Sequence, residues 1–142
     1  MMAMTIHVDI VSAEKEIFSG LVEAVFATAT LGEVGIYPRH TPLLTSLKPG
    51  EVRVKFANGT EEQFYVSGGM LEVQPHVVTI LADTAMRADD VDEAAAIAAQ
   101  QAAEQTLASS DMIVDFSEVQ AQLAEASAQL RVVQHARKSA GR

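Results

Sequence analysis

The residue types that most often do chemistry are scattered along this chain and match no known catalytic spacing. The sequence contains no cysteine, which excludes a disulfide framework and a thiolate metal site. It also contains no phosphate-binding glycine loop, no nucleophile elbow and no paired metal-ligand spacing. Ser67, His40 and Asp83 are the residue types of a hydrolase triad, but nothing in their spacing supports one. We therefore expect neither a catalytic site nor a bound metal.

Three of the four histidines have ordinary structural interpretations. His7 lies opposite the apolar face of a predicted strand, and His76 follows a proline, so we expect a surface residue and a turn residue. His135 is expected to join the basic C-terminal tip. His40 lies in the loop 32–42, whose two glycines and two prolines suggest a well-defined conformation. This loop is either packed in the ordinary way or serves as a recognition surface.

Charge is distributed unevenly over a chain whose formal net charge is −9. That sign argues against nucleic acid as a partner. Residues 88–130 carry nine acidic residues and no Lys or Arg, which is most simply a solvated face, whereas the last twelve residues carry four basic residues and no acid. A basic tip on an acidic body suggests directional electrostatics, although it also complements the negative end of a helix dipole.

The chain changes character near residue 88. All four prolines and seven of the eight glycines lie at or before Pro75, whereas 15 of the 55 residues from Ala88 onward are alanine. Pro and Gly punctuate turns, while a stretch rich in Ala and poor in both favours helix. We therefore predict a β domain over residues 1–87 and a helical tail over residues 88–142. The start of the chain has no signal-peptide pattern and no segment is long and apolar enough to span a membrane, so a soluble, cytosolic protein is expected.

The first module has the pattern of an antiparallel β-sandwich or flattened barrel. Alternation and short apolar runs predict eight strands or more, at about residues 5–11, 22–28, 33–37, 43–47, 51–56, 61–66, 70–73 and 77–82. Asn58-Gly59 predicts a hairpin turn, Phe18–Leu21 is read as a tight turn, and Pro49-Gly50 is expected to end a strand. Gly68-Gly69 predicts a β-bulge or kink, or else a close approach of a partner to the backbone.

The second module is predicted to form two helices, at about residues 90–108 and 116–138. Asp90–Glu93 and Asp115–Glu118 each have the form of a capping box, and Ser109-Ser110-Asp111 interrupts the helical pattern. The second helix carries a seam with coiled-coil spacing, formed by Phe116, Val119, Leu123, Ala126, Leu130 and Val133.

The first helix presents mostly small side chains, so the two helices can pack closely as an antiparallel hairpin. Small side chains bury little area, and at about 25 cal/mol per Å² the hairpin gains little stability from its own interface. The second helix spans roughly 35 Å at about 1.5 Å per residue. A long and weakly held element of this kind has the properties of a mobile arm.

Four segments, in this order and spacing, resemble the epsilon subunit of bacterial F-type ATP synthase. They are Val8–Phe18 with its Val11-Ser12-Ala13-Glu14, the loop Gly32–Leu44, the run Ser67–Val73, and Val78–Thr84. The Ala-rich two-helix tail agrees with the same family, so the resemblance covers essentially the whole chain.

The resemblance implies an N-terminal antiparallel β-sandwich of about ten strands, followed by a C-terminal antiparallel two-helix hairpin. It implies a rotor subunit of the central stalk with no catalytic residues of its own, whose sandwich binds the gamma subunit and the c-subunit ring. The helices would lie on the sandwich or extend toward the alpha and beta subunits of the catalytic head, where they would inhibit ATP hydrolysis. Such a subunit lies at the cytoplasmic face of the bacterial inner membrane and is not inserted in it.

Carried onto this sequence, the resemblance places the c-ring interface at Thr30, Leu31, Gly32, Arg39, His40, Thr41 and Pro42. It places the inhibitory arm contacts at Leu123, Leu130, Arg131, Val133, Arg137 and Lys138. Some members of the family bind ATP through a motif at the start of the first helix. Here Asp92 of that motif is present, but Ala95 stands in place of its arginine, so a charge-assisted contact to phosphate is missing. We expect weak or absent ATP binding and no other cofactor.

Two other functions are compatible with the residues alone. An unrelated β-sandwich binding module could dimerise through the seam of the second helix, and a stable homodimer would favour that function. A small hydrolase would need an assembled site, which the sequence lacks.

Overall fold

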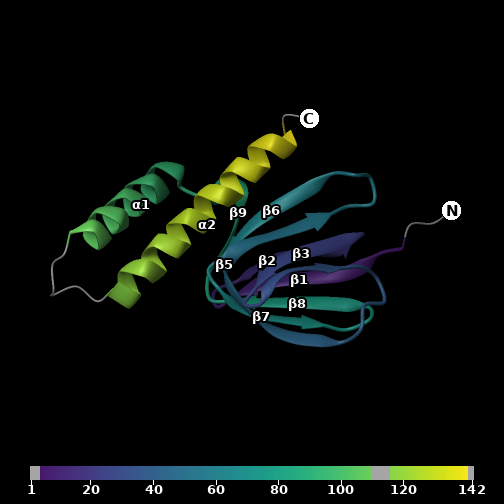
Figure 1. The fold of residues 1–142 in the computed structure, drawn as a ribbon. Helices are drawn as coiled ribbons and strands as arrows, with labels where there is room; N and C mark the ends of the chain where they lie inside the picture. Colours follow the sequence, from purple (N-terminus) through teal and green to yellow (C-terminus); the bar gives the residue numbers. More distant parts are fainter. Residues whose placement is uncertain (1–3, 110–115, 141–142) are drawn as a thin grey trace.

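The computed structural model describes residues 4–109 and 116–140, which form a β-sandwich followed by a helical hairpin (Figure 1). The nine strands of these residues are β1 Ile6–Ser12, β2 Glu16–Val22, β3 Ala24–Ala29, β4 Gly32–Ile36, β5 Leu43–Lys55, β6 Glu61–Val66, β7 Gly69–Val73, β8 Val77–Ala82 and β9 Ala85–Arg87. A short 3-10 helix, η1 Ala88–Asp90, leads to α1 Glu93–Ala108 and α2 Phe116–Ala140. The predicted fold class is confirmed, with nine strands where about ten were expected.

Strand β5 connects the two parts of the sandwich. The strand order is β2-β1-β8-β7-β5-β3-β4, and β6 pairs with β5 and β9. The first part of β5, Leu43–Leu47, pairs with β7, and the second part, Gly50–Lys55, pairs with β6. The pairs are antiparallel, as predicted, except for β1 with β8, which is parallel.

Pro49-Gly50 does not end a strand, because β5 runs through both residues. The ladders pair Leu47 with β3 and β7 and Gly50 with β6, and they leave Pro49 between these two registers. The proline therefore stands where its missing N–H removes no ladder hydrogen bond. A Cβ on Gly50 would lie 2.7 Å from the Cβ of Thr28. Pro49 and Gly50 thus lie where β5 stops pairing with β7 and begins to pair with β6.

Phe18–Leu21 is part of strand β2 and not a tight turn. The turn before β2 is closed instead by Ser12, whose N–H donates to the carbonyl of Lys15 over 2.9 Å. The ring of Phe18 lies 3.3 Å from the position that a Cβ would take on Gly20. This glycine therefore makes room for an aromatic ring, and its presence gave a false turn signal.

The apolar core lies inside the sandwich and follows the predicted alternation. Ile6, Val8 and Ile10 of β1 are fully buried, while His7 faces outward and hydrogen-bonds Asp9 over 2.9 Å. The Ser19 hydroxyl also donates to Asp9, and this bond holds the pKa of that carboxyl below its usual value. Other core side chains include Val22, Val25, Ile36, Leu47, Val52, Val54, Phe64, Val66, Leu71, Val73, Val78 and Ile80.

The hairpin turn predicted at Asn58-Gly59 is confirmed, and the pair Gly68-Gly69 is explained by its backbone conformation and by close packing within the chain. Asn58-Gly59 forms the β5–β6 turn, with Gly59 at φ +90° and the Asn58 side chain accepting from the N–H of Thr60. Gly68 and Gly69 have φ values of +124° and +142°, and a Cβ on Gly69 would lie 2.0 Å from the carbonyl oxygen of Leu81. The close approach at this site is made by strand β8 of the same chain, so the glycine pair is explained without a partner.

The N-cap of helix α1 lies two residues later than the sequence suggested. Its N-cap is Asp92, whose side chain accepts from the N–H of Ala95 over 3.0 Å, whereas Asp90 belongs to η1. Ser109 ends the helix, as expected. The second predicted capping residue, Asp115, lies outside the described residues, as do positions 110 and 111 of the predicted break.

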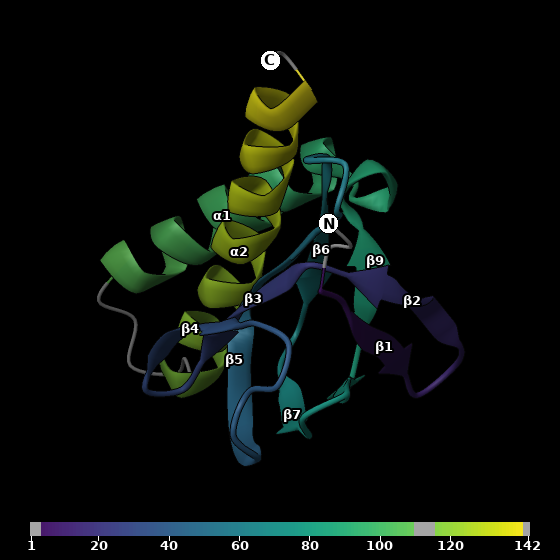
Figure 2. The same ribbon diagram turned by 90° about the vertical axis from the view of Figure 1, so that its right-hand side faces the viewer.

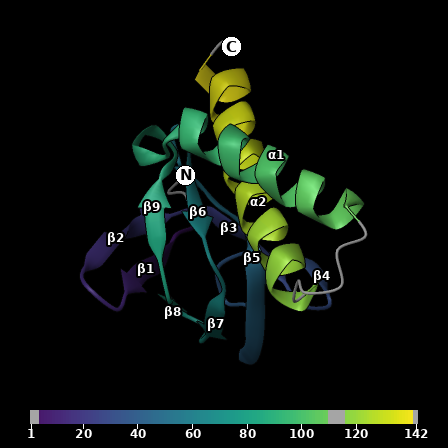
Figure 3. The same cartoon turned by 90° about the vertical axis from the view of Figure 1, so that its left-hand side faces the viewer.

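Helix α2 lies between α1 and the sandwich. Figure 1 shows α1, α2 and the strands side by side in that order, and Figure 3 shows α1 crossing in front of α2. Figure 2, from the opposite side, shows α2 running along the sandwich, where it contacts β5 and β6. Helix α1 therefore reaches the sandwich chiefly through α2.

Replacing Gly69 by Ala should lower the free energy of unfolding by roughly 3 kcal/mol, because the added methyl group meets the backbone of β8 at a positive φ. Gly59→Ala is the matched control: its φ is also positive, but nothing lies within 4 Å of the new Cβ. We expect a loss of only about 1 kcal/mol there. Urea unfolding of both variants measures the difference, and equal losses would show that the contact with β8 is unimportant.

Candidate functional site

The arm is attached to the sandwich through a small apolar patch. Tyr65 of β6 is 1% exposed and packs against Ala128 and Val132 of α2. We call these three residues the docking patch. Partly buried side chains around it are those of Met86, Ala88 and Val91, from β9, η1 and the segment that follows.

Tyr65 projects from the outer surface of the sandwich and is buried there by α2. Its neighbours Phe64 and Val66 belong to the inner core, so three successive residues of β6 are buried on two sides. Burial, helped by the negative charge of Glu125 and opposed by a hydrogen bond with Gln129, raises the pKa of Tyr65 to about 12. The neutral phenol is therefore the form that fits under the docked helix.

A second contact joins α2 to β5. Nδ1 of His135 lies 2.9 and 3.0 Å from the two carboxylate oxygens of Glu51. The Glu51 side chain is only 11% exposed, and that of His135 is 41% exposed. Since Glu51 pairs with Tyr65 across the β5–β6 ladder, this contact adjoins the docking patch. His135 lies in the basic end of α2, as expected, and the structure adds that its imidazole binds a carboxylate of the sandwich.

Arg53 lies on the same outer surface, two residues from Glu51. Its guanidinium stands 4.5 Å from the ring centre of Phe26, and its Nη1 is 3.8 Å from a Glu51 oxygen. Its Nε is buried and, among the described residues, has no hydrogen-bond partner, although Glu61 approaches it to 3.7 Å. Glu51 therefore has a cation on one side and the imidazole of His135 on the other.

Helix α2 is buried on two opposite sides. Residues advance by about 100° each around a helix, so Val119, Ala126 and Val133 share one side, whereas Ala128, Val132 and His135 share the other. The first side faces α1: Arg137 binds Glu93 at the start of α1. The Gln100 amide of α1 likewise donates to Ser127 over 3.2 Å. The predicted seam is therefore the hairpin side, and the docking side was not predicted.

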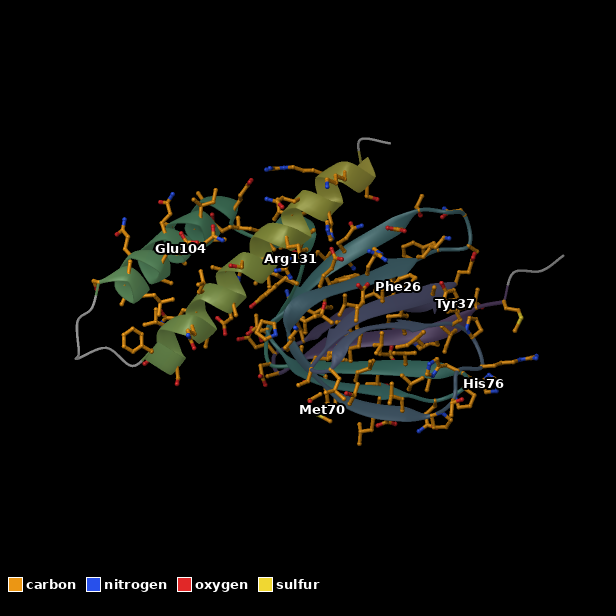
Figure 4. All side chains as sticks on the ribbon, in the orientation of Figure 1. Phe26, Tyr37, Met70, His76, Glu104 and Arg131 are labelled. Atoms are coloured by element: carbon orange, nitrogen blue, oxygen red, sulfur yellow. The ribbon has the colours of Figure 1, made fainter. Side chains whose placement is uncertain are left out.

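The six predicted arm contacts do not lie on one surface. Leu123 and Leu130 are half-buried, Val133 is buried, and with Arg137 they lie on the side of α2 that faces α1. Arg131 and Lys138 are exposed, and Figure 4 shows Arg131 on α2. A homodimer built on this seam would have to displace α1, which weakens the dimerising-module alternative.

The seven predicted c-ring residues form two groups. Thr30, Leu31 and Gly32 lie at the β3–β4 turn, where Leu31 is 96% exposed, while the group Arg39–Pro42 follows the other end of β4. Thr30 bonds Ser46, which pairs with Met70. Figure 4 shows Met70 and, at the opposite end of the sandwich, Tyr37 and His76. The assignment of these residues to the c-ring interface stays a prediction, and β4 lies between the two groups.

The loop after β4 is well packed. Arg39 adopts φ +65°, a conformation that side chains other than Gly rarely take, and its N–H donates to the carbonyl of Pro75. Nδ1 of His40 lies 2.6 Å from the carbonyl oxygen of Thr41. The ring of Tyr37 packs edge-to-face on Phe26. The loop is thus rigid, exposed and held by the β7–β8 turn, where His76 lies as predicted.

The described residues assemble no chemical site. Ser67, three residues before Met70, bonds the backbone of Thr84 near Asp83, whereas the N–H of His40 donates to the carbonyl of Tyr37, which Figure 4 shows at the opposite end of the sandwich from Met70, so the triad residues are apart. The same residues contain no cluster of ligands that could hold a metal ion. No helix among them has the length and apolarity to cross a membrane.

Two features of the described residues around the arm are unfavourable for a bound nucleotide. The carboxylate of Asp92 is occupied in capping α1. A groove of about 500 Å³ lies between the β5–β6 turn and the end of α2, and its charged lining consists of Glu61, Glu62, Asp89 and Arg87. An excess of carboxylates repels a phosphate chain.

The sequence contained one signal for the docking patch that the alternation rule overlooks. Phe64, Tyr65 and Val66 are consecutive large apolar residues, whereas a strand covered on one side alternates. Such a run indicates that something covers the outer surface as well. Ala128 and Val132 gave no comparable signal, since small and single apolar residues are common on solvated helices.

Comparison with known proteins gives the following matches. Residues 5–88 match the family model of the ATP synthase delta/epsilon chain β-sandwich domain, and residues 89–134 match that of its long α-helix domain. The chain is 64% identical to an ATP synthase epsilon chain of Nitrosococcus oceani, covering 99% of this chain and 100% of that one. It is 59% identical to that of Legionella pneumophila strain Corby, covering 96% and 98%.

Two solved structures share the fold. One is a chain of the mitochondrial ATP synthase OSCP/F1/c-ring assembly of Euglena gracilis, at a TM-score of 0.79 and 22% identity, covering 97% of this chain and 83% of that one. The other comes from the central stalk and c ring of the Tetrahymena thermophila enzyme, at a TM-score of 0.57 and 14% identity, covering 96% and 98%.

Ionising Tyr65 should release the arm. Because its pKa is raised from 10.0 to about 12 in the docked structure, its contribution to docking is complete below pH 10.0 and is lost as the pH rises through about 12. In a Tyr37→Phe variant, which leaves one tyrosine, tyrosinate absorbance should appear near pH 12. Deleting residues 88–142 from that variant should move it toward 10, since the arm supplies the burial. An unchanged titration after the deletion would contradict this origin of the shift.

Proposed function

Since this chain belongs to the family of ATP synthase epsilon chains, we propose that it couples the gamma subunit to the c ring and restrains ATP hydrolysis through its helical arm. The β-sandwich is the fixed part, and α1 with α2 is the moving part. One observation carries the proposal: α2 is attached on two opposite sides by two limited interfaces, so that it can leave one or both without disturbing the core.

The structure corresponds to the docked state of the arm, in which hydrolysis is not inhibited. In the extended state, Leu123, Leu130 and Val133 contact other subunits, so α2 must separate from α1 as well as from the docking patch. A shift of the arm from 1:99 to 99:1 requires about 5.5 kcal/mol of differential interaction. Exposed charge pairs supply too little, so apolar burial of the α2 seam against gamma and the catalytic head provides most of it.

The basic residues at the end of α2 steer the extended arm toward acidic groups of the catalytic head. Arg131 and Lys138 are exposed in the docked state, while Arg137 is held by Glu93. Separation of the two helices frees Arg137, so all three cations become available to acidic groups of the alpha and beta subunits. Charges of this kind mainly steer the encounter and fix its register.

The c ring meets the sandwich along β4 and the two turns that flank it. β4 is an edge strand, and it joins the exposed Leu31 at one end to the rigid loop Arg39–Pro42 at the other. A partner that follows this edge contacts both groups, although they lie apart. The subunit itself binds ATP weakly or not at all, and it is a peripheral component at the cytoplasmic face of the bacterial inner membrane.

Deleting residues 88–142 should raise ATP hydrolysis by the assembled complex about fivefold, because the arm that enters the catalytic head is lost. Assembly and proton-coupled synthesis should survive, since the core of the sandwich contains no residue of either helix. Hydrolysis rates of purified complexes with full-length and truncated chain provide the measurement. Unchanged hydrolysis in a correctly assembled complex would contradict an inhibitory arm.

Replacing Arg131, Arg137 and Lys138 together by Ala should relieve inhibition roughly two- to fivefold at low salt and less at high salt, since exposed charges are screened. Glu93→Gln is the matched control, because it removes the Arg137 pair within the hairpin but keeps all three cations. We expect the control to stay inhibited or become more so. If the triple variant is inhibited like the wild type at low salt, the basic end has no part in binding the head.

A further inference from the structure

We propose that Glu51 and His135 form a pH-sensitive latch that holds the arm on the sandwich more firmly when the imidazole is protonated. This inference uses the mobility of the arm proposed above but does not require that the arm inhibits hydrolysis. His135 is the residue type whose charge changes near neutral pH, and it is placed at the joint between the moving and the fixed part.

The geometry favours the charged form of this contact. One ring nitrogen faces both oxygens of Glu51, at 2.9 and 3.0 Å, and the carboxylate is largely enclosed. A neutral imidazole can donate one hydrogen bond from this nitrogen. Protonation keeps that bond and adds the attraction between two opposite charges, which makes the bond charge-assisted. Undocking moves the imidazole into water, where the attraction is lost.

Other charged groups around the latch come from every element that packs on α2. They are Arg53 of β5, Glu61, Glu62 and Tyr65 of β6, Arg87 of β9, Asp89 of η1, Glu93 of α1, and Glu125, Arg131, Arg137 and Lys138 of α2 itself. Side chains of these types ordinarily keep one charge state between about pH 5.5 and about pH 8, whereas histidine does not. The change of docking in this interval is therefore carried by His135.

The direction follows from the linkage between protonation and docking. The contact with the Glu51 carboxylate is stronger for a charged imidazole, so docking is strongest in mildly acidic solution, where histidine is ordinarily protonated, and weaker in mildly alkaline solution, where histidine is ordinarily neutral. Acidification of the surrounding solution thus retains the arm on the sandwich, and alkalinisation releases it. Arg53 competes for the same carboxylate from 3.8 Å, and after release it remains as the partner of Glu51.

The substitution Ala128→Cys allows the pH dependence of arm docking to be measured on the isolated full-length chain, which has no cysteine of its own. Ala128 is 1% exposed on the side of α2 that faces the sandwich, so iodoacetamide reacts with the new thiol only when α2 separates from the sandwich. Dividing the rate by that of a peptide with the same cysteine, at the same pH, gives the opening constant. We expect this constant to rise roughly three- to tenfold from about pH 5.5 to about pH 8.

Two variants in the Ala128→Cys background isolate the latch. His135→Gln and Glu51→Gln each keep hydrogen-bonding capacity but remove one charge, so each should abolish the pH dependence. His76→Gln, a change at an exposed turn of the sandwich, should keep it. The proposal is overturned if the opening constant does not change with pH when both Glu51 and His135 are present. It is also overturned if the pH dependence is unchanged in the Glu51→Gln or the His135→Gln variant.

A second reporter separates undocking from opening of the hairpin. Ala103 of α1 is 3% exposed and belongs to the helix that contacts the sandwich chiefly through α2. A cysteine there should show no effect of Glu51→Gln on its pH dependence. Equal effects at both reporters would mean that the charge acts on the stability of the whole chain and would also overturn the latch. Because no other subunit is present, none of these outcomes depends on inhibition of hydrolysis.

Discussion

Helix α2 packs against α1 on one side and against the sandwich on the opposite side, and the arrangement of the rest of the arm follows from this constraint. On one side its seam packs on α1, and on the other Ala128 and Val132 cover Tyr65. Helix α1 therefore needs little direct contact with the sandwich. Its position depends on α2, so the hairpin moves as one body if only the docking side opens, and α2 moves alone if both sides open.

The composition of the two sides of α2 explains why neither of its two interfaces is permanent. The hairpin side is rich in alanine, which allows close packing but removes little apolar area from water. The docking side consists of one aromatic ring, two small aliphatic side chains and one ion pair, which is far less than the interior of the sandwich offers. A chain with these two interfaces can keep a rigid core while its C-terminal part exchanges between partners, as expected of a regulatory arm.

Period-two alternation predicted most strands because most of them bury one side in a single core, with β6 as the exception, since Phe64, Tyr65 and Val66 are buried on two sides. The errors came where a residue served packing with a distant segment. Gly20 lies under the ring of Phe18, and Pro49 lies where β5 changes partners, so both resemble turn residues without forming turns. The docking contact of His135 with Glu51 spans 84 residues of sequence, and no local pattern reports a pair at that distance.

An ion pair at this joint is informative because an apolar pair would hold the arm more tightly. Removing two charges from water opposes their attraction, so a partly enclosed pair contributes less than well-packed apolar side chains of similar size. What the pair adds is dependence on conditions near neutral pH: its strength varies there with protonation and salt, whereas the apolar contact of Tyr65 with Val132 stays constant in that range. Placed beside the docking patch, the pair makes the affinity of the arm for the sandwich adjustable without changing the apolar contact that defines where the arm docks.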